Sequence, residues 1–169
     1  MEDLSMKAGK IIGKVAGIGA IGGAIAGIAY LNKKNYEKSS VLEGRYKSYY
    51  QLTNQWLMNK NEGKKVSKYF EDNGIKSVAI YGMGTLGELF YEEVKDSDIK
   101  VGYFIDKNSD ILCYGMDEIP ITSIDGIAEQ EEVDAIIVTP VFDFDVIEED
   151  LDKVTDIQLI SLEDVVYGL

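Results

Sequence analysis

The sequence predicts an α/β protein, in which a doubly wound parallel sheet of five strands follows an N-terminal helical region. Three observations support this prediction. From residue 75 onward, short apolar runs alternate with helical segments, which is typical of parallel strands joined by helical crossovers. Glycines follow the first of these runs at G-x-G-x-x-G spacing. Residues 11–31 form an apolar, glycine-rich run with a single charge.

The five strands are short and bounded by turn residues. Right-handed crossovers between them predict the order 3-2-1-4-5, with the topological switch between the first and fourth strands, where ligands of such sheets bind. The clearest strand is "VDAIIVT", because five apolar residues in seven suit a strand that is covered on both faces. The strands are expected over residues 77–82, 100–106, 119–121, 133–139 and 157–161.

The chain is expected to have three parts: an apolar helix over residues 1–33, a Tyr- and Trp-rich helical connector over 34–74 and the α/β domain over 75–169. The apolar run at 11–31 approaches the length that crosses a bilayer, and more bases follow it than precede it. The positive-inside rule then predicts a single-pass protein of the cell membrane whose C-terminal domain is cytoplasmic. A cleaved signal peptide and a soluble or peripheral segment are the alternatives.

Two features favour self-association. Glycines in and just before the apolar run fall four residues apart in two series, Gly9-Gly13-Gly17 and Gly19-Gly23-Gly27, and such spacing lets membrane helices approach closely. Apolar and aromatic residues recur at helical spacing over residues 42–57. That stripe is expected to pack on the α/β domain or on the same helix of a second chain.

The composition excludes several function classes. The chain has 30 acidic and 17 basic residues, and its net charge of −13 argues against nucleic acid as a partner. It has no histidine, which removes histidine acid–base chemistry, and its single cysteine, Cys113, cannot form an internal disulfide. No metal site and no catalytic residue are predicted.

The stretch "IYGMGTLGELF" carries most of the functional signal, because its glycine loop lies between a strand and a helix. Gly82 would permit a sharp turn, Gly84 would let a pyrophosphate approach the backbone, and Gly87 would let helix and strand pack closely. The N-terminus of the following helix offers unpaired N–H groups to an anion. Asp106, at the end of the second strand, could accept hydrogen bonds from a ribose or a base. Lys107 and Thr139 are rim candidates; the equal alternatives are a solvated side chain for Lys107 and the last buried strand residue for Thr139.

A resemblance rests on "IYGMGTLGELFYEEV", "GYFIDKN", "IPITSID", "VDAIIVT" and "ISLEDV". Over residues 62–169 the chain resembles the small Rossmann-like domains of bacterial cell-surface glycan biosynthesis. These are similar to the N-terminal domain of nucleotide-sugar acyltransferases and to the core of nucleotide-sugar epimerases. The resemblance implies a nucleotide-sugar, or an NAD(P)-like dinucleotide, as the ligand and a glycosyltransferase as a partner. The positions that it carries over are Gly82, Met83, Gly84, Thr85, Gly87 and Asp106.

The chain departs from the epimerases at their catalytic Tyr-x-x-x-Lys motif. The near match, Tyr91 to Lys95, falls on the first helix of the domain, where that motif does not belong. The favoured hypothesis is therefore a membrane-anchored module that binds a nucleotide or nucleotide-sugar, without catalytic activity of its own, and serves glycan assembly. The alternatives are a scaffold that has lost the ligand and, less favoured, an NAD(P)-dependent oxidoreductase or epimerase.

Overall fold

The computed structural model describes residues 2–112 and 116–169, with side chains from residue 30 onward. Cys113 lies outside the described residues. The chain divides into two compact units, Met1–Tyr46 and Lys47–Leu169. The second unit contains the sheet together with residues 47–74, which the sequence assigned to the connector.

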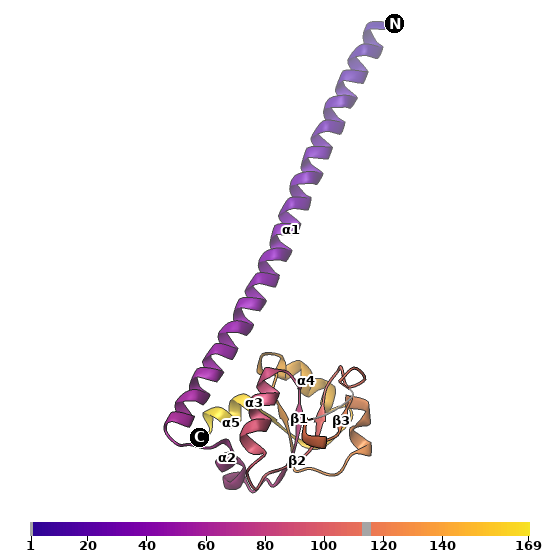
Figure 1. Ribbon diagram of the computed structural model, residues 1–169. Helices are drawn as coiled ribbons and strands as arrows, with labels where there is room; N and C mark the ends of the chain where they lie inside the picture. The colour runs from indigo at the N-terminus through magenta and orange to yellow at the C-terminus, as the bar shows by residue number, and fades with distance from the viewer. Residues whose placement is uncertain (1, 113–115) are drawn as a thin grey trace. The chain divides into compact units, whose positions relative to one another are not determined.

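The second unit is built around a five-stranded, all-parallel sheet in the order β3-β2-β1-β4-β5 (Figure 1). This confirms the predicted doubly wound order. The strands are β1 (Ser77–Tyr81), β2 (Lys100–Ile105), β3 (Ile121–Thr122), β4 (Ala135–Val138) and β5 (Gln158–Ser161). Four of them match the predicted runs closely, whereas β3 is a two-residue strand that begins after Pro120, which has no N–H to donate to a ladder.

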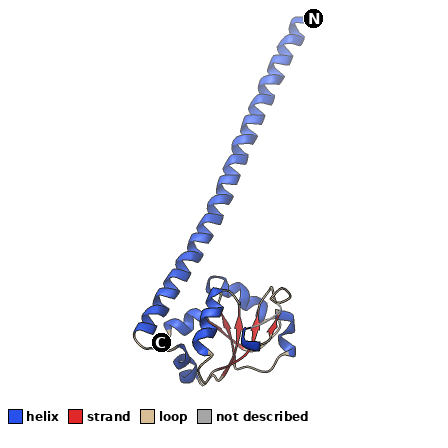
Figure 2. Ribbon diagram, in the orientation of Figure 1, coloured by secondary structure: helices blue, strands red, loops and turns tan. Residues whose placement is uncertain are grey.

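Helices cover both faces of the sheet (Figure 2). The first face packs against α2 (Val66–Asn73), α3 (Thr85–Val94), α5 (Leu162–Tyr167) and the end of α1 (Glu2–Asn61). The second face packs against α4 (Phe144–Leu151) and the 3-10 helix η2 (Ile124–Glu129). Two further 3-10 turns are η1 (Met116–Glu118) and η3 (Val141–Asp143). Because helices cover both faces of the sheet, the inner strand β4 is buried along its whole length.

The C-terminal part of α1 belongs to the core of the second unit. Leu52 and Trp56 are buried in the cluster on the first face of the sheet. The Trp56 indole N–H donates to Glu93 Oε2 at 2.8 Å, and the Asn59 side-chain amide donates to the Val166 carbonyl at 2.6 Å. The predicted packing of the aromatic helix on the α/β domain is therefore confirmed for Trp56, whereas four other residues of the predicted stripe are exposed: Leu42, Tyr46, Tyr50 and Leu57.

Glu93, in the last turn of α3, accepts hydrogen bonds and an ion pair from residues of the connector. In addition to Trp56, its carboxylate receives Lys60 Nζ at 3.1 Å and the Val66 backbone amide at 3.3 Å. The Glu93 side chain is only 11% exposed. A carboxylate near a helix C-terminus is disfavoured by the helix dipole and by burial, so these three donors hold a charge that α3 alone would not stabilise.

The described residues of the first unit, 2–46, all belong to α1. Among the residues that the structure describes, no helix is long and apolar enough to cross a membrane. The predicted span at residues 11–31 is thus not confirmed, and its residues 11–29 lie outside the part of the chain whose side chains are described.

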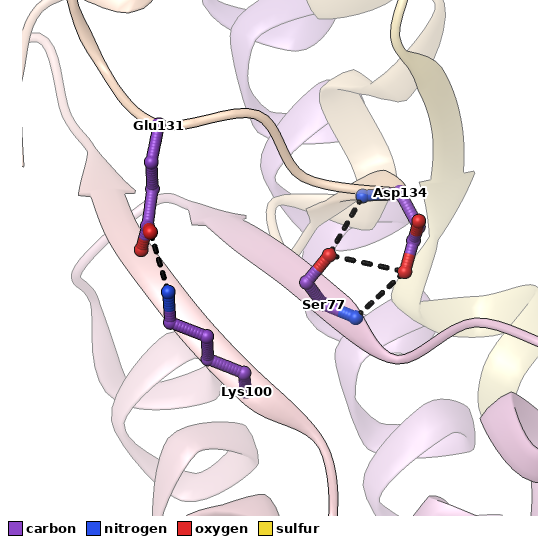
Figure 3. A network of polar contacts seen from close by, with 4 residues as sticks. All are labelled: Ser77, Lys100, Glu131 and Asp134. Atoms are coloured by element: carbon purple, nitrogen blue, oxygen red, sulfur yellow. Dashed lines mark hydrogen bonds and ion pairs between the residues drawn. The ribbon is translucent and has the colours of Figure 1, made fainter.

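Asp134, immediately before β4, fastens the amino end of the sheet (Figure 3). Its Oδ2 accepts hydrogen bonds from the backbone amides of Lys76 and Ser77, each at 2.8 Å, and from the Ser77 hydroxyl at 3.0 Å. These donors hold the pKa of the Asp134 carboxyl below its ordinary value. Beside it, Lys100 of β2 pairs with Glu131. All of these contacts lie at the edge opposite the glycine loop, so we assign them to stability.

Candidate functional site

The glycine loop joins β1 to α3 and begins with a residue that only glycine suits. Gly82 has φ +93°, a conformation that side-chain-bearing residues rarely adopt. A Cβ on it would lie 2.9 Å from Thr139 Oγ1 and 3.0 Å from the Pro140 ring. Its N–H donates to the Ile105 carbonyl at 2.8 Å. The turn therefore lies between the ends of β2 and β4, where there is no space for a side chain at residue 82.

Gly87 supplies the close approach between helix and strand. A Cβ at this position would lie 2.0 Å from the Gly82 carbonyl oxygen, which is far inside van der Waals contact. Helix α3 can cross so near to the turn only because residue 87 has no side chain. The role that the sequence predicted for Gly87 agrees with this geometry.

Gly84 differs from the other two glycines, because a Cβ on it would meet nothing within 4 Å. It is the N-cap of α3, with φ −83° and ψ −175°, and no side chain caps the helix. The first N–H groups of a helix have no partner within it, so the start of α3 beside the open space at Gly84 has backbone donors to offer. Thr85 is exposed, whereas Met83 is half-buried against the core.

Asp106 lies beside this loop and is already bonded to it. Its Oδ2 accepts the Met83 backbone N–H at 2.8 Å, and its Oδ1 accepts the Asn108 backbone N–H at 2.8 Å. A carboxylate has about four acceptor positions, so two remain for a ligand. Asp106 therefore positions the glycine loop, a role that the spacing alone did not predict.

Thr139 has a structural role, because its side chain bonds the backbone of the glycine turn. It is 2% exposed, and its Oγ1 lies 3.0 Å from the Tyr81 carbonyl and 3.1 Å from the Gly82 carbonyl. The hydroxyl holds the glycine turn against β4, which agrees with the alternative that Thr139 is a buried residue at the end of its strand. Lys107 is exposed, and its charge helps Lys153 to lower the pKa of Asp150 on α4.

The carboxyl end of the sheet is rich in acids. The segments that follow β1, β2 and β4 there, residues 82–89, 106–112 and 139–146, contain five acidic side chains and one base, Lys107. Carboxylates raise the cost of placing a phosphate nearby, since like charges repel. Any anionic ligand must therefore rely on the backbone N–H groups of the loop.

Two buried tyrosines, Tyr81 at the end of β1 and Tyr103 within β2, are not among the predicted site residues. The hydroxyls of Tyr81 and Tyr103 are buried in the cluster under α4 and have no hydrogen-bond partner among the described residues. Burial raises the pKa of both phenols, and the charges of Asp106 and Asp150 raise that of Tyr81 further. Both residues occupy apolar-looking strand positions, so no sequence pattern distinguishes them from ordinary core aromatics.

The Tyr91–Lys95 pair is held in structural contacts. The Tyr91 hydroxyl donates to Asp117 Oδ2 at 2.9 Å, and Lys95 pairs with Glu92 at 2.8 Å. Asp117 and the next residue, Glu118, have positive φ values of 49° and 67°. The Tyr91 bond therefore fastens a strained turn next to β3, which is the role that this geometry supports.

Three hollows lie away from the glycine loop. Two of them, with volumes of about 420 and 640 Å³, border the Gly63–Ser67 stretch, and a third of about 340 Å³ lies at the start of β2. None of the three is lined by a predicted site residue. Within the described residues, no group of three or more acidic or cysteine side chains is arranged to hold a metal ion.

Comparisons with known proteins found no family model, no curated protein and no solved structure that matches this chain. The geometry of the glycine loop is therefore the main observation that bears on function.

Proposed function

We propose that the chain binds a nucleotide or nucleotide-sugar at the Gly82–Gly87 loop and Asp106. The observation that carries the proposal is the contrast among three glycines. Gly82 and Gly87 are required by local packing, whereas the space above Gly84 is open and lies against an uncapped helix N-terminus. Phosphates bind well at such a place, because the N–H groups and the helix dipole both favour an anion.

The wider role proposed for the module follows from the resemblance and from the apolar N-terminal run. It would serve bacterial glycan assembly at the cytoplasmic face of the cell membrane, anchored through residues 11–31, as an accessory of a glycosyltransferase. In this role it would deliver or sense the ligand without turning it over. The residues near the loop support the last point, since Tyr91 and Lys95 are engaged in structural contacts.

A scaffold without ligand is the second candidate, and two observations favour it. Asp106 already accepts two backbone N–H groups, and one of them, from Met83, is a donor of the loop itself. The surrounding edge carries five acids against one base. In that case the glycine loop is only a tight turn.

Thermal shift measurements on the full chain decide between these candidates. The ligand panel comprises UDP-, GDP-, CDP- and dTDP-sugars, NAD, NADP, ATP and coenzyme A. A ligand at a hundred times its Kd adds about 2.7 kcal/mol of stability, which is a visible shift. Gly84→Val fills the open space and should abolish the shift, while Gly84→Ala tests the effect of a single methyl group.

The outcome is clear because neither substitution is expected to disturb the fold. A response to one nucleotide class that Gly84→Val removes supports the proposal and identifies the ligand class. Silence across the panel from a well-folded protein contradicts it and favours the scaffold.

A further inference from the structure

The segment that joins α1 to α2 concentrates positive charge in an otherwise acidic protein. Residues 60–68 contain four lysines and one acid, whereas the whole chain carries a net charge of −13. Two hollows, of about 420 and 640 Å³, border this segment. Because lysines at a concave surface attract an anion, the charge of each hollow is the first property to compare.

The charged side chains that line the two hollows differ in balance. The larger hollow is lined by three lysines and five acids, which disfavours an anion. The smaller hollow is lined by three lysines and two acids, and we name it the lysine hollow. One of its acids, Asp72, is paired with Lys68. Lys64 and Lys65 are therefore opposed within the lysine hollow by Glu71 alone.

Ser67, in the first turn of α2, brings an unsatisfied hydroxyl to the lysine hollow. The residue lines the hollow and is only 8% exposed. Within the part of the chain that the structure describes, its hydroxyl has no hydrogen-bond partner, yet it is not sealed from the hollow as the Tyr81 and Tyr103 hydroxyls are sealed in the core. Its partner must therefore come from outside the protein. Water or an anion can supply it, and the lysines favour the anion.

The backbone of Ser67 adds a second donor. Helix α2 spans eight residues, and no side chain caps its N-terminus. The Val66 N–H donates to Glu93 Oε1 at 3.3 Å, and the Lys68 N–H donates to the Lys65 carbonyl at 3.0 Å. Of the first three N–H groups of α2, that of Ser67 alone has no partner among the described residues. Since a helix N-terminus favours negative charge, one anion can accept both the N–H and the O–H of Ser67.

The turn that carries the lysines is fixed by backbone hydrogen bonds. The Lys64 N–H donates to the Asn59 carbonyl at 2.9 Å, and the Gly63 N–H donates to the Lys60 carbonyl at 3.0 Å. Asn59 is itself 1% exposed and bonded to Val166. The backbone of the lysine hollow is thus in place before any ligand arrives, so that binding requires little further ordering of the chain.

We propose that the lysine hollow binds a phosphate monoester, with Ser67 donating its hydroxyl and its backbone N–H to phosphate oxygens while Lys64 and Lys65 supply charge. A phosphate dianion needs several donors and positive charge at one place. A volume of about 420 Å³ also admits the rest of a small organic molecule. Two sources share this chemistry, a soluble phosphorylated metabolite and the headgroup of a phospholipid. The site shares no residue with the Gly82–Gly87 loop, so either proposal can fail without the other.

Isothermal titration calorimetry of the full chain in detergent tests the site, with glycerol 3-phosphate as the ligand. Titrations at two temperatures detect binding that produces no heat at one of them. Ser67→Ala should weaken binding about tenfold or more, because it removes a hydrogen bond to a charged group. Lys65→Gln should weaken it about two- to fivefold, since Lys65 is exposed. Lys47→Gln is the matched control, because Lys47 is also exposed but lines none of the three hollows described above.

Neither test variant should disturb the fold. Ser67→Ala removes a hydroxyl that has no partner among the described residues, and alanine suits a helix. Lys65 is exposed, so Lys65→Gln keeps the proposal testable even if Ser67→Ala fails to fold. Urea unfolding followed by Trp56 fluorescence verifies both variants.

A short-chain lipid distinguishes the two sources. Dihexanoyl phosphatidic acid, used below its critical micelle concentration, carries the same phosphate monoester as glycerol 3-phosphate. Tighter binding of the lipid identifies a headgroup as the ligand, and equal or weaker binding identifies a soluble metabolite. Either result supports the proposal when Ser67→Ala and Lys65→Gln weaken the binding.

The remaining outcomes overturn the proposal. If wild-type protein binds neither compound, the lysine hollow is not a phosphate site. If either Ser67→Ala or Lys65→Gln folds and leaves the affinity unchanged, or if Lys47→Gln weakens binding as much as Lys65→Gln does, the phosphate binds elsewhere or by charge alone. Binding that Gly84→Val abolishes and Ser67→Ala leaves intact belongs to the glycine loop, which overturns this inference and supports the proposed nucleotide site.

Discussion

Replacing Gly87 by alanine should destabilise the second unit strongly, whereas the same change at Gly84 should do almost nothing. At Gly87 the new Cβ would be placed 2.0 Å from the Gly82 carbonyl oxygen. That contact must open by more than 1 Å, so α3 has to move away from β1. Overpacking of this kind costs about 1–3 kcal/mol, and the better helix propensity of alanine returns less than about 1 kcal/mol.

At Gly84 the opposing effects are small and nearly cancel. The new methyl group meets nothing within 4 Å, and φ of −83° suits alanine. Alanine is a poorer N-cap than glycine, but it also restricts the unfolded chain, and each effect amounts to roughly 0.5–1 kcal/mol. The expected change in the free energy of unfolding is therefore close to zero.

Urea denaturation measures both variants, and the protein contains its own reporter. Trp56 is the single tryptophan and is buried in the core of the second unit, so its fluorescence follows unfolding of that unit. Gly87→Ala should lower the free energy of unfolding by about 2 kcal/mol. If Gly87→Ala and Gly84→Ala unfold at the same urea concentration, the close crossing of helix and strand is absent, and the assignment of roles in the loop is wrong.

Three further predictions concern the fold. Asp134→Asn should lower the free energy of unfolding at neutral pH, as measured by urea titration. The difference from the wild type should shrink as pH falls below about 4, because a carboxyl whose pKa is depressed in the folded state loses its contribution when it is protonated. A difference that stays constant with pH would contradict this. Glu93→Ala should cost about 1.5–3 kcal/mol by urea denaturation, since it leaves the buried Trp56 N–H without its acceptor, while Glu93→Gln should cost less. Tyr81→Phe and Tyr103→Phe should each raise the thermal midpoint of unfolding. Each change removes a buried hydroxyl that has no partner among the described residues, which should stabilise the fold by about 1 kcal/mol. A lowered midpoint would reveal a partner for the hydroxyl.

The sheet could be predicted from sequence because its signals are local and agree with one another. The "VDAIIVT" run, the glycine turn after β1 and the alternation of strands and helices all indicate one topology, and handedness then fixes the order. Short irregular elements were harder. The strand expected at residues 119–121 is the two-residue β3, and the 3-10 helix η2 follows it. Neither segment carries enough periodicity for the sequence to define its type or length.

The geometry of the glycine loop could be predicted from the sequence, but the roles of the residues around it could not. Glycine spacing correctly indicated a turn at Gly82 and a close approach at Gly87. It could not indicate that Asp106 bonds the Met83 amide or that Thr139 is buried beneath the turn, because both depend on the packing of three strands that are distant in sequence. The charge of the whole edge was equally hidden, since its acids come from three separate segments.

The contact between Asn59 and Val166 has a consequence for biosynthesis. The two residues are 107 positions apart, and Trp56 meets Glu93 after 37. On the ribosome, the end of α1 emerges long before either of its partners, with Leu52 and Trp56 still uncovered. This packing is thus completed only after residue 166 has emerged, and a chaperone that shields the tryptophan-bearing helix during that interval should raise the yield of folded protein.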